Sequence, residues 1–177
     1  ADVAVKHDLI IIADEIYSEL TYDGFQFESI PTLRDDLRER TIIASGWSKT
    51  YSMTGWRLGW AAAPLPFIKA MGKLQSQSTS NVPAMTQMAA MAALEGSHDF
   101  LPEWIEAFDR RRRMMVEGLN QLEGVNCPTP LGAFYVFPDF TNVLGKRWKG
   151  EPLGTSLRLA EFLLEEARVA VVPGEGF

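Results

Sequence analysis

Lys49 lies in the run SGWSKTYSMTGWRLGW at residues 45–60, which is otherwise rich in glycine, hydroxyl groups and tryptophan. A solvated loop would carry more charge, and a core strand would carry fewer glycines and no lysine. Small residues let backbone approach a bound group closely. Burial disfavours the ammonium form of a lysine, and a neutral amine is a nucleophile toward aldehydes. The run therefore favours a reactive amine over a turn packed by tryptophans with an incidental lysine.

Two neighbours of Lys49 are suited to an anionic group. Arg57 follows eight residues later in the chain, with Gly55 and Gly59 beside it, and the planar fork of a guanidinium suits a phosphate dianion. Ser48 can add a hydroxyl donor. The whole chain has 17 basic and 23 acidic residues, a net charge of −6 and a pI of about 5.0. Its overall field therefore attracts neither nucleic acid nor anionic membrane, and any phosphate must be held locally.

A carboxylate and a phenol stand upstream of this run. Asp14 follows the apolar residues 9–13, and so stands at the C-terminal end of a predicted buried strand, where open α/β sheets place their ligands. If the chain turns helical after Asp14, the spacing of three brings Tyr17 to the same side. The alternative is that Asp14 only caps that helix. A reactive lysine, a phosphate-binding arginine and a strand-end carboxylate match the needs of pyridoxal phosphate, whose ring nitrogen an aspartate keeps protonated.

The surrounding segments predict the elements that position these residues. Continuous apolar strands are expected at 9–13, 41–45 and 57–64, which is typical of a sheet covered on both faces in an α/β protein. Helices are expected at 66–77 and 82–96, followed by a long helix within 97–124 that links two domains. A strand at 131–140, a helix at 156–167 and a strand at 169–174 would then form a small α+β unit.

Other conspicuous residues have structural interpretations. The four arginines at 110–113 fan around a helix axis, which favours a solvated or interdomain role over phosphate binding. His7 and His98 lack a partner at metal-ligand spacing, so no metal site is expected. The single cysteine, Cys127, is interpreted as inert and fits a reducing cytoplasm. No apolar run approaches the roughly 18 residues that a bilayer requires, so no membrane span is expected.

On these motifs the sequence resembles the class I/II aminotransferases of fold type I. The run at 45–60 is similar to their pyridoxal-phosphate attachment site, and IIADEIYSEL to their upstream aspartate and tyrosine segment, in the same order. The likeness continues through KLQSQSTSNVPAMTQ, GAFYVFPDF and FLLEEARVAVVPGEGF, and is greatest to the prokaryotic-type aspartate aminotransferases. It implies an α/β fold in which residues 1–96 are the C-terminal half of the large pyridoxal-phosphate-binding domain. Residues 97–177 would be the interdomain helix and most of the small α+β domain.

The resemblance also implies a role for each residue of the expected site. Lys49 would form the internal aldimine with the cofactor, and its freed amine would move the proton between substrate Cα and cofactor C4′. Asp14 would pair with the pyridinium nitrogen, and Tyr17 would hydrogen-bond the ring oxygen O3′. Ser48 and Arg57 would hold the phosphate.

Some positions depart from the family pattern. Gly46 stands where some relatives have a hydroxyl, which leaves the role of Ser45 open. Ser80 and Asn81 resemble a stretch near the dimer interface and the active site, and their role is open as well. The family's stacking aromatic, its cross-dimer tyrosine and its arginine for the substrate carboxylate fall outside residues 1–177. The chain is therefore expected to be a fragment, and to be inactive by itself.

The activity that the resemblance implies is that of an enzyme, a cytoplasmic homodimer. It would transfer an amino group between an amino acid, with aspartate favoured, and a 2-oxo acid such as 2-oxoglutarate. Cofactor-binding motifs do not choose the bond that is broken. A carbon–sulfur lyase or decarboxylase on the same fold therefore stays open, as does a non-catalytic aminotransferase-like sensor domain of a transcription regulator. Neither a nucleic acid nor a membrane is an expected partner of the enzyme.

Overall fold

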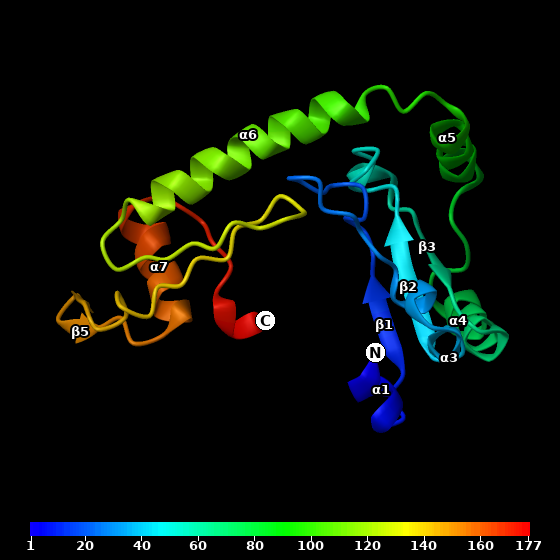
Figure 1. Ribbon diagram of the computed structural model, residues 1–177, viewed down its shortest axis with the longest axis horizontal. Helices are drawn as coiled ribbons and strands as arrows, with labels where there is room; N and C mark the ends of the chain where they lie inside the picture. The colour runs from blue at the N-terminus through cyan, green and yellow to red at the C-terminus, as the bar shows by residue number, and fades with distance from the viewer. The chain divides into compact units, whose positions relative to one another are not determined.

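The computed structural model describes all of residues 1–177, which divide into two compact units (Figure 1). Unit 1 comprises Ala1–Ala107 and Leu131–Ala133, and unit 2 comprises Phe108–Pro130 and Phe134–Phe177. The 20-residue helix α6 (Leu101–Asn120) belongs partly to each unit. The expected domain boundary between residues 96 and 97 stays a prediction.

A three-stranded sheet in the order β1-β2-β3 organises unit 1. Strands β1 (Ile11–Asp14) and β2 (Thr41–Gly46) are parallel, and β3 (Gly59–Ala62) runs antiparallel to β2. The three strands expected at 9–13, 41–45 and 57–64 are confirmed, with shifted ends. Because β1 and β2 run the same way, the segments that follow them leave the sheet at the same edge.

Burial of the sheet on both faces, expected from its continuous apolar strands, is not seen in β1. Ile12 is 74% exposed, and Ala13 is the buried residue of the strand. β1 is also an edge strand of the three. A continuous apolar run indicates that a strand can be buried on both faces. The strand is in fact buried only where another element packs against each face of the sheet.

The helix expected after Asp14 is absent, and turns take its place. Ser18 N–H donates to the Glu15 carbonyl at 3.1 Å, and Leu20 N–H donates to the Tyr17 carbonyl at 2.9 Å. Leu20 is fully buried, and the backbone of the next residue bridges to Gly132. The chain after Asp14 therefore forms two hydrogen-bonded turns and then joins the bridge to Gly132.

Helices in unit 1 match the prediction where the apolar pattern is long. The helices expected at 66–77 and 82–96 are confirmed as α4 (Leu65–Ser78) and α5 (Ala84–Glu95). Pro64 and Pro83 directly precede them, where the missing N–H leaves no intrahelical bond unmade. The sequence predicts a helix tail before the first strand, and α1 (Asp2–Lys6) confirms it. Short helices that the pattern does not predict are α2 (Ile30–Leu33), α3 (Asp35–Arg38) and the 3₁₀ turn η1 (Thr54–Trp56).

Unit 2 is built around α7 (Ser156–Glu166), which confirms the helix expected at 156–167. The Thr155 hydroxyl accepts from Arg158 N–H at 3.2 Å and caps this helix. A small hairpin of β4 (Arg147–Trp148) and β5 (Glu151–Pro152) precedes it, and η2 (Gly174–Gly176) follows.

The strands expected at 131–140 and 169–174 are wrong. The first segment makes only isolated bridges, Gly132 with Thr21 and Asp139 with Asn126, and the second makes none. A strand needs a continuous partner for its backbone N–H and C=O groups, and alternating apolar residues alone do not supply one. No helix of the chain is both long enough and apolar enough to cross a bilayer.

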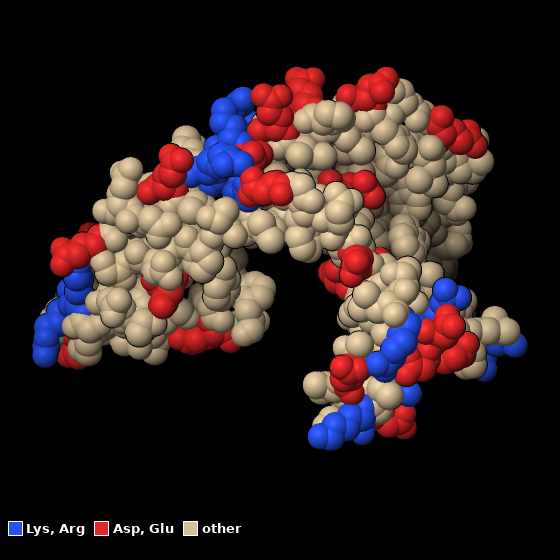
Figure 2. All heavy atoms as spheres, viewed as in Figure 1, with Lys and Arg blue, Asp and Glu red and all other residues tan.

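The arginines of α6 differ from one another in their surroundings. Figure 2 shows basic side chains gathered in one group along α6, with acidic side chains beside them. Arg112 is only 5% exposed, so the solvated role expected for the arginine run is wrong at this position. Its guanidinium lies 2.5 Å from Asp109 Oδ1 and donates to the Pro130 carbonyl at 2.6 Å, and Arg113 donates to Asp109 Oδ2 at 3.0 Å. Asp109 therefore holds two arginines of one helix face, and Arg112 ties α6 to the loop that follows.

This arrangement predicts a pH-dependent contribution of Asp109 to stability. Burial raises the pKa of Asp109, but hydrogen bonds from Arg113 and Arg112 outweigh burial, so its folded pKa lies below the usual value. The ionised carboxylate thus stabilises the fold above about pH 4, the unfolded pKa of an aspartate, and this contribution is lost as pH falls through the lower folded pKa. Asp109→Asn should lower the free energy of unfolding by about 1–3 kcal/mol at pH 7, and wild type and variant should converge in acid. Urea unfolding at several pH values measures both.

Asp35 supplies the matched control, since it also pairs with an arginine three residues on, Arg38, at 3.8 Å. Both of these side chains are well exposed, and exposed ion pairs contribute at most about 1 kcal/mol. Equal losses in Asp35→Asn and Asp109→Asn would show that the buried position of Arg112 has no special weight.

Candidate active site

Two backbone segments meet at the edge of the sheet where β1 and β2 end. Asp14 and Ala44 are partners in the parallel register. Just beyond them, Glu15 N–H donates to the Ala44 carbonyl at 2.8 Å, and Ser45 Oγ donates to the Glu15 carbonyl at 3.2 Å. These bonds hold the turn after β1 against the end of β2, and they give Ser45 a structural role.

Lys49 and Tyr17 come together at this edge. The Lys49 Nζ lies 5.7 Å from the centre of the Tyr17 ring, within the range of a cation–π contact. Both residues are half-buried. The amine from the loop after β2 and the phenol from the turn after β1 therefore lie within reach of one small ligand.

Asp14 lies at the end of β1 with its side chain exposed. Its Oδ1 accepts from Ile16 N–H at 3.2 Å, which is the local capping bond of an Asx turn. This oxygen caps a turn, whereas the capping alternative placed Asp14 at the start of a helix that the chain does not form. The other carboxylate oxygen stays available to a ligand.

Ser48 and Arg57 belong to the same loop as Lys49 but are held differently. Ser48 is half-buried. Arg57 is exposed, and its Nη1 donates to the Thr54 carbonyl at 2.8 Å within the loop itself. Its backbone is left-handed, with φ 51° and ψ 49°, and Ser52 has a φ of 52°. Left-handed residues other than glycine cost free energy, and six more of them lie outside this loop, so this geometry by itself does not mark the site.

Gly46 has a role that the sequence interpretation missed. A Cβ at Gly46 would lie 2.8 Å from the Leu58 carbonyl oxygen and 2.9 Å from the Gly59 Cα, and a Cβ at Gly59 would lie 3.0 Å from the Ser45 carbonyl oxygen. The two glycines are partners in the β2–β3 register. At Gly46 the close neighbour is therefore the backbone of β3. The sequence had instead suggested that the small residues of this run make room for a bound group. The sequence carries no signal for this contact, because Gly55 also precedes a tryptophan and has open space around it.

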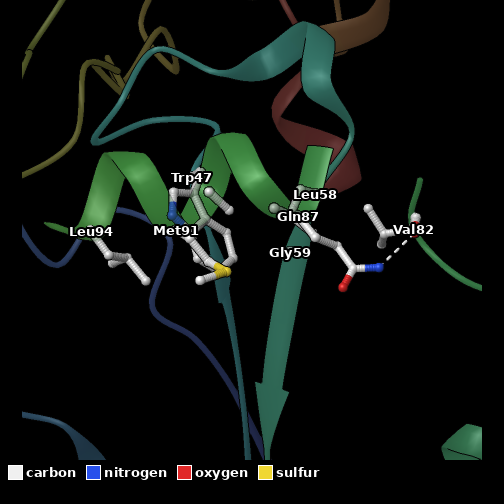
Figure 3. Close-up of a pocket in the computed structure, with 8 residues that line it drawn as sticks. Trp47, Leu58, Gly59, Val82, Gln87, Met91 and Leu94 are labelled. Carbon is white, nitrogen blue, oxygen red and sulfur yellow. Dashed lines mark hydrogen bonds between the residues drawn. The ribbon is translucent and has the colours of Figure 1, made fainter. Parts of the chain in front are cut away.

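An apolar cavity of about 380 Å³ lies near this loop but is not the chemical site (Figure 3). No titratable side chain lines it, and Gln87 Nε2 within it donates to the Val82 carbonyl at 2.8 Å. Trp47 Nε1 is buried without a hydrogen-bond partner. The lining residues are Trp47, Leu58, Gly59, Val82, Gln87, Ala90, Met91 and Leu94.

An amine, a phenol and a carboxylate at the carboxyl edge of a parallel strand pair define an α/β protein with a candidate site for a carbonyl-bearing ligand. The model of the family described as aminotransferase class I and II matches residues 1–177. The chain belongs to this aminotransferase family, and the recognition made from its motifs is confirmed.

Individual relatives agree with this family. An aspartate aminotransferase of Streptomyces avermitilis is 46% identical over 174 residues, which are 98% of this chain and 43% of the relative. An aspartate/prephenate aminotransferase of Cereibacter sphaeroides is 44% identical over 178 residues, which are 99% of this chain and 44% of the relative. The chain thus spans less than half the length of the curated relatives it matches.

The fold is confirmed by a solved structure. The crystal structure of the aspartate aminotransferase from Rhizobium meliloti aligns with a TM-score of 0.90 and 43% identity, over 98% of this chain and 44% of that one. The expected α/β architecture of fold type I is therefore correct, although two of the expected strands are absent from this chain.

The close approach at Gly46 predicts a specific sensitivity. Gly46→Ala should force β2 and β3 apart next to the Lys49 loop and lower the free energy of unfolding by about 1–3 kcal/mol, the usual cost of overpacking. Gly55→Ala is the control, because its added Cβ would meet no atom within 4 Å. Denaturant unfolding followed by circular dichroism measures both, and equal stabilities would contradict the steric account.

Proposed function

We propose that the whole protein to which this chain belongs is a pyridoxal-phosphate-dependent aminotransferase, with Lys49 as its catalytic lysine. The observation that carries the proposal is the 5.7 Å approach of the Lys49 amine to the Tyr17 ring, at the edge of the sheet where Asp14 ends β1. Membership of the aminotransferase family over residues 1–177 supports the same proposal.

The residues at this edge fit the chemical groups of pyridoxal phosphate. Asp14 has a carboxylate oxygen beyond the one that caps the turn, and it would hold the positive charge of the ring nitrogen. Tyr17 would donate to the ring oxygen O3′. Ser48 offers a hydroxyl, and Arg57 keeps guanidinium N–H groups beyond the bond from Nη1 to Thr54, so these two would bind the phosphate.

Proton movement at the substrate is assigned to Lys49. Pyridoxal phosphate, when bound, supplies an aldehyde for an amine and an electron sink for negative charge at Cα. The Lys49 amine would take the proton from substrate Cα and deliver it to cofactor C4′, which is the general acid–base role that a neutral lysine amine can fill. Tyr17 beside it would orient the amine.

The substrates and the assembly are part of the proposal. Aspartate is favoured as the amino acid because relatives at 42–46% identity are named aspartate aminotransferases, and a 2-oxo acid such as 2-oxoglutarate would accept the amino group. An aromatic aminotransferase from Pyrococcus horikoshii also aligns, at 40% identity and a TM-score of 0.85. The fold alone therefore does not determine which side chain the amino-acid substrate carries. The active form would be a cytoplasmic homodimer.

Covalent labelling tests the assignment of Lys49. After incubation of the protein with pyridoxal phosphate and reduction with borohydride, peptide mass spectrometry should find the added mass on the peptide that contains Lys49. Lys69 and Lys73 of α4 are internal controls, since both are exposed. Labelling confined to these two lysines, or undiminished in Lys49→Ala, would refute the assignment.

Substitutions at Asp14 separate its two functions. Asp14→Asn retains an oxygen for Ile16 N–H but loses the charge, whereas Asp14→Ala loses both. If the charge supports the chemistry, loss of it should lower the pKa of the cofactor's ring nitrogen by at least one unit. One pKa unit corresponds to 1.36 kcal/mol, so turnover by the whole protein should fall at least about tenfold in both variants. Near-normal turnover in Asp14→Asn would mean that the carboxylate only caps the turn. Steady-state kinetics with aspartate and 2-oxoglutarate measures the effect.

A further inference from the structure

Tyr51 connects the loop that carries Lys49 to the segment between α5 and α6. Its backbone N–H donates to the Trp47 carbonyl at 3.2 Å, and Ser52 N–H donates to the Lys49 carbonyl at 3.3 Å, so the backbone of the loop is a closed turn. The Tyr51 ring packs edge-on against the His98 ring, with centroids 5.5 Å apart, and 6.2 Å from the Phe100 ring.

His98 contacts two oxygens with one ring nitrogen. The His98 Nε2 lies 3.2 Å from the Tyr51 hydroxyl and 3.2 Å from the Ala93 carbonyl oxygen. A carbonyl oxygen only accepts, so the contact with Ala93 requires the proton on Nε2. The Tyr51 oxygen then accepts from the same N–H, in a three-centre hydrogen bond.

The position of Ala93 explains why this contact is stable. Ala93 lies in the last turn of α5, where carbonyl groups have no partner within the helix, and a histidine side chain is one of the groups that satisfies them. The His98 carbonyl in turn accepts from Leu101 N–H, at the start of α6, at 3.0 Å. The Phe100 and Trp104 rings, 4.8 Å apart, extend the aromatic contact onto that helix. His98 is thus held from both sides, and all these residues belong to unit 1.

We propose that His98 is a positioning residue for Lys49: it fixes the Tyr51 side chain to the end of α5 and thereby orders the turn that presents the lysine amine. His98 has no partner at metal-ligand spacing in the sequence, and its hydrogen-bond partner Tyr51 lies two residues beyond Lys49. The catalytic consequence rests on the proposed function, whereas the ordering of the turn does not.

Amide hydrogen exchange tests the ordering directly in the whole protein to which this chain belongs, without added cofactor. The amides of Tyr51, Ser52 and Met53 should exchange about two to ten times faster in Tyr51→Phe and in His98→Ala, the range that follows from loss of one hydrogen bond. His98→Gln retains an N–H donor and should restore slow exchange. Amides of α7 are the internal control, and His7→Ala, at the other histidine, is the control variant.

Aldehyde labelling with pyridoxal phosphate and borohydride gives the second measurement. Incorporation at Lys49, relative to Lys69, should fall by a similar factor in His98→Ala and return in His98→Gln. Unchanged exchange and labelling in His98→Ala, or failure of glutamine to rescue, would overturn the positioning role. If exchange responds as expected while wild-type Lys49 takes no label, His98 orders the turn and it is the proposed function that fails.

Discussion

The parallel pairing of β1 with β2 is the constraint on which the candidate site depends. Its register sets Asp14 beside Ala44, so the segments after both strands leave at one edge of the sheet. Two hydrogen bonds at Glu15 then close the gap between them. Tyr17 and Lys49 are separated by 31 residues in the chain, and without this pairing nothing would bring the phenol ring and the amine to within 5.7 Å of each other.

The antiparallel pairing of β2 with β3 constrains the site from the other side. Gly46 and Gly59 face each other so closely that neither position has room for an ordinary side chain. The loop between these strands must reverse direction and present Lys49, and it does so with left-handed backbone at Ser52 and Arg57. Backbone geometry of this kind costs free energy and persists only when surrounding contacts over-determine it. The contact of Tyr51 with His98 is one such contact.

Apolar side chains stay exposed over much of both units. Ile12 of β1, Met85 and Met88 of α5, and Val172 are each largely accessible to solvent. Exposed apolar residues at such density mark surfaces that other protein can cover. The chain spans less than half the length of its curated relatives, and chains of that greater length contain additional polypeptide that can cover such surfaces.

The sequence by itself determined the family and the α/β class, because local motifs carry that information, and it predicted the residues of the expected site. Strands and helices with long, regular apolar patterns were also predictable, as at β2, α4, α5 and α7. The tertiary structure decided those features that depend on contacts between residues far apart in the sequence. It replaced a helix after Asp14 with turns that end at the buried Leu20. It left 131–140 and 169–174 without strand partners, it buried Arg112 against Asp109, and it joined His98 to Tyr51 across 47 residues. Each of these outcomes depends on which distant backbone or side chain arrives at a position, and a residue's neighbours in sequence do not specify that.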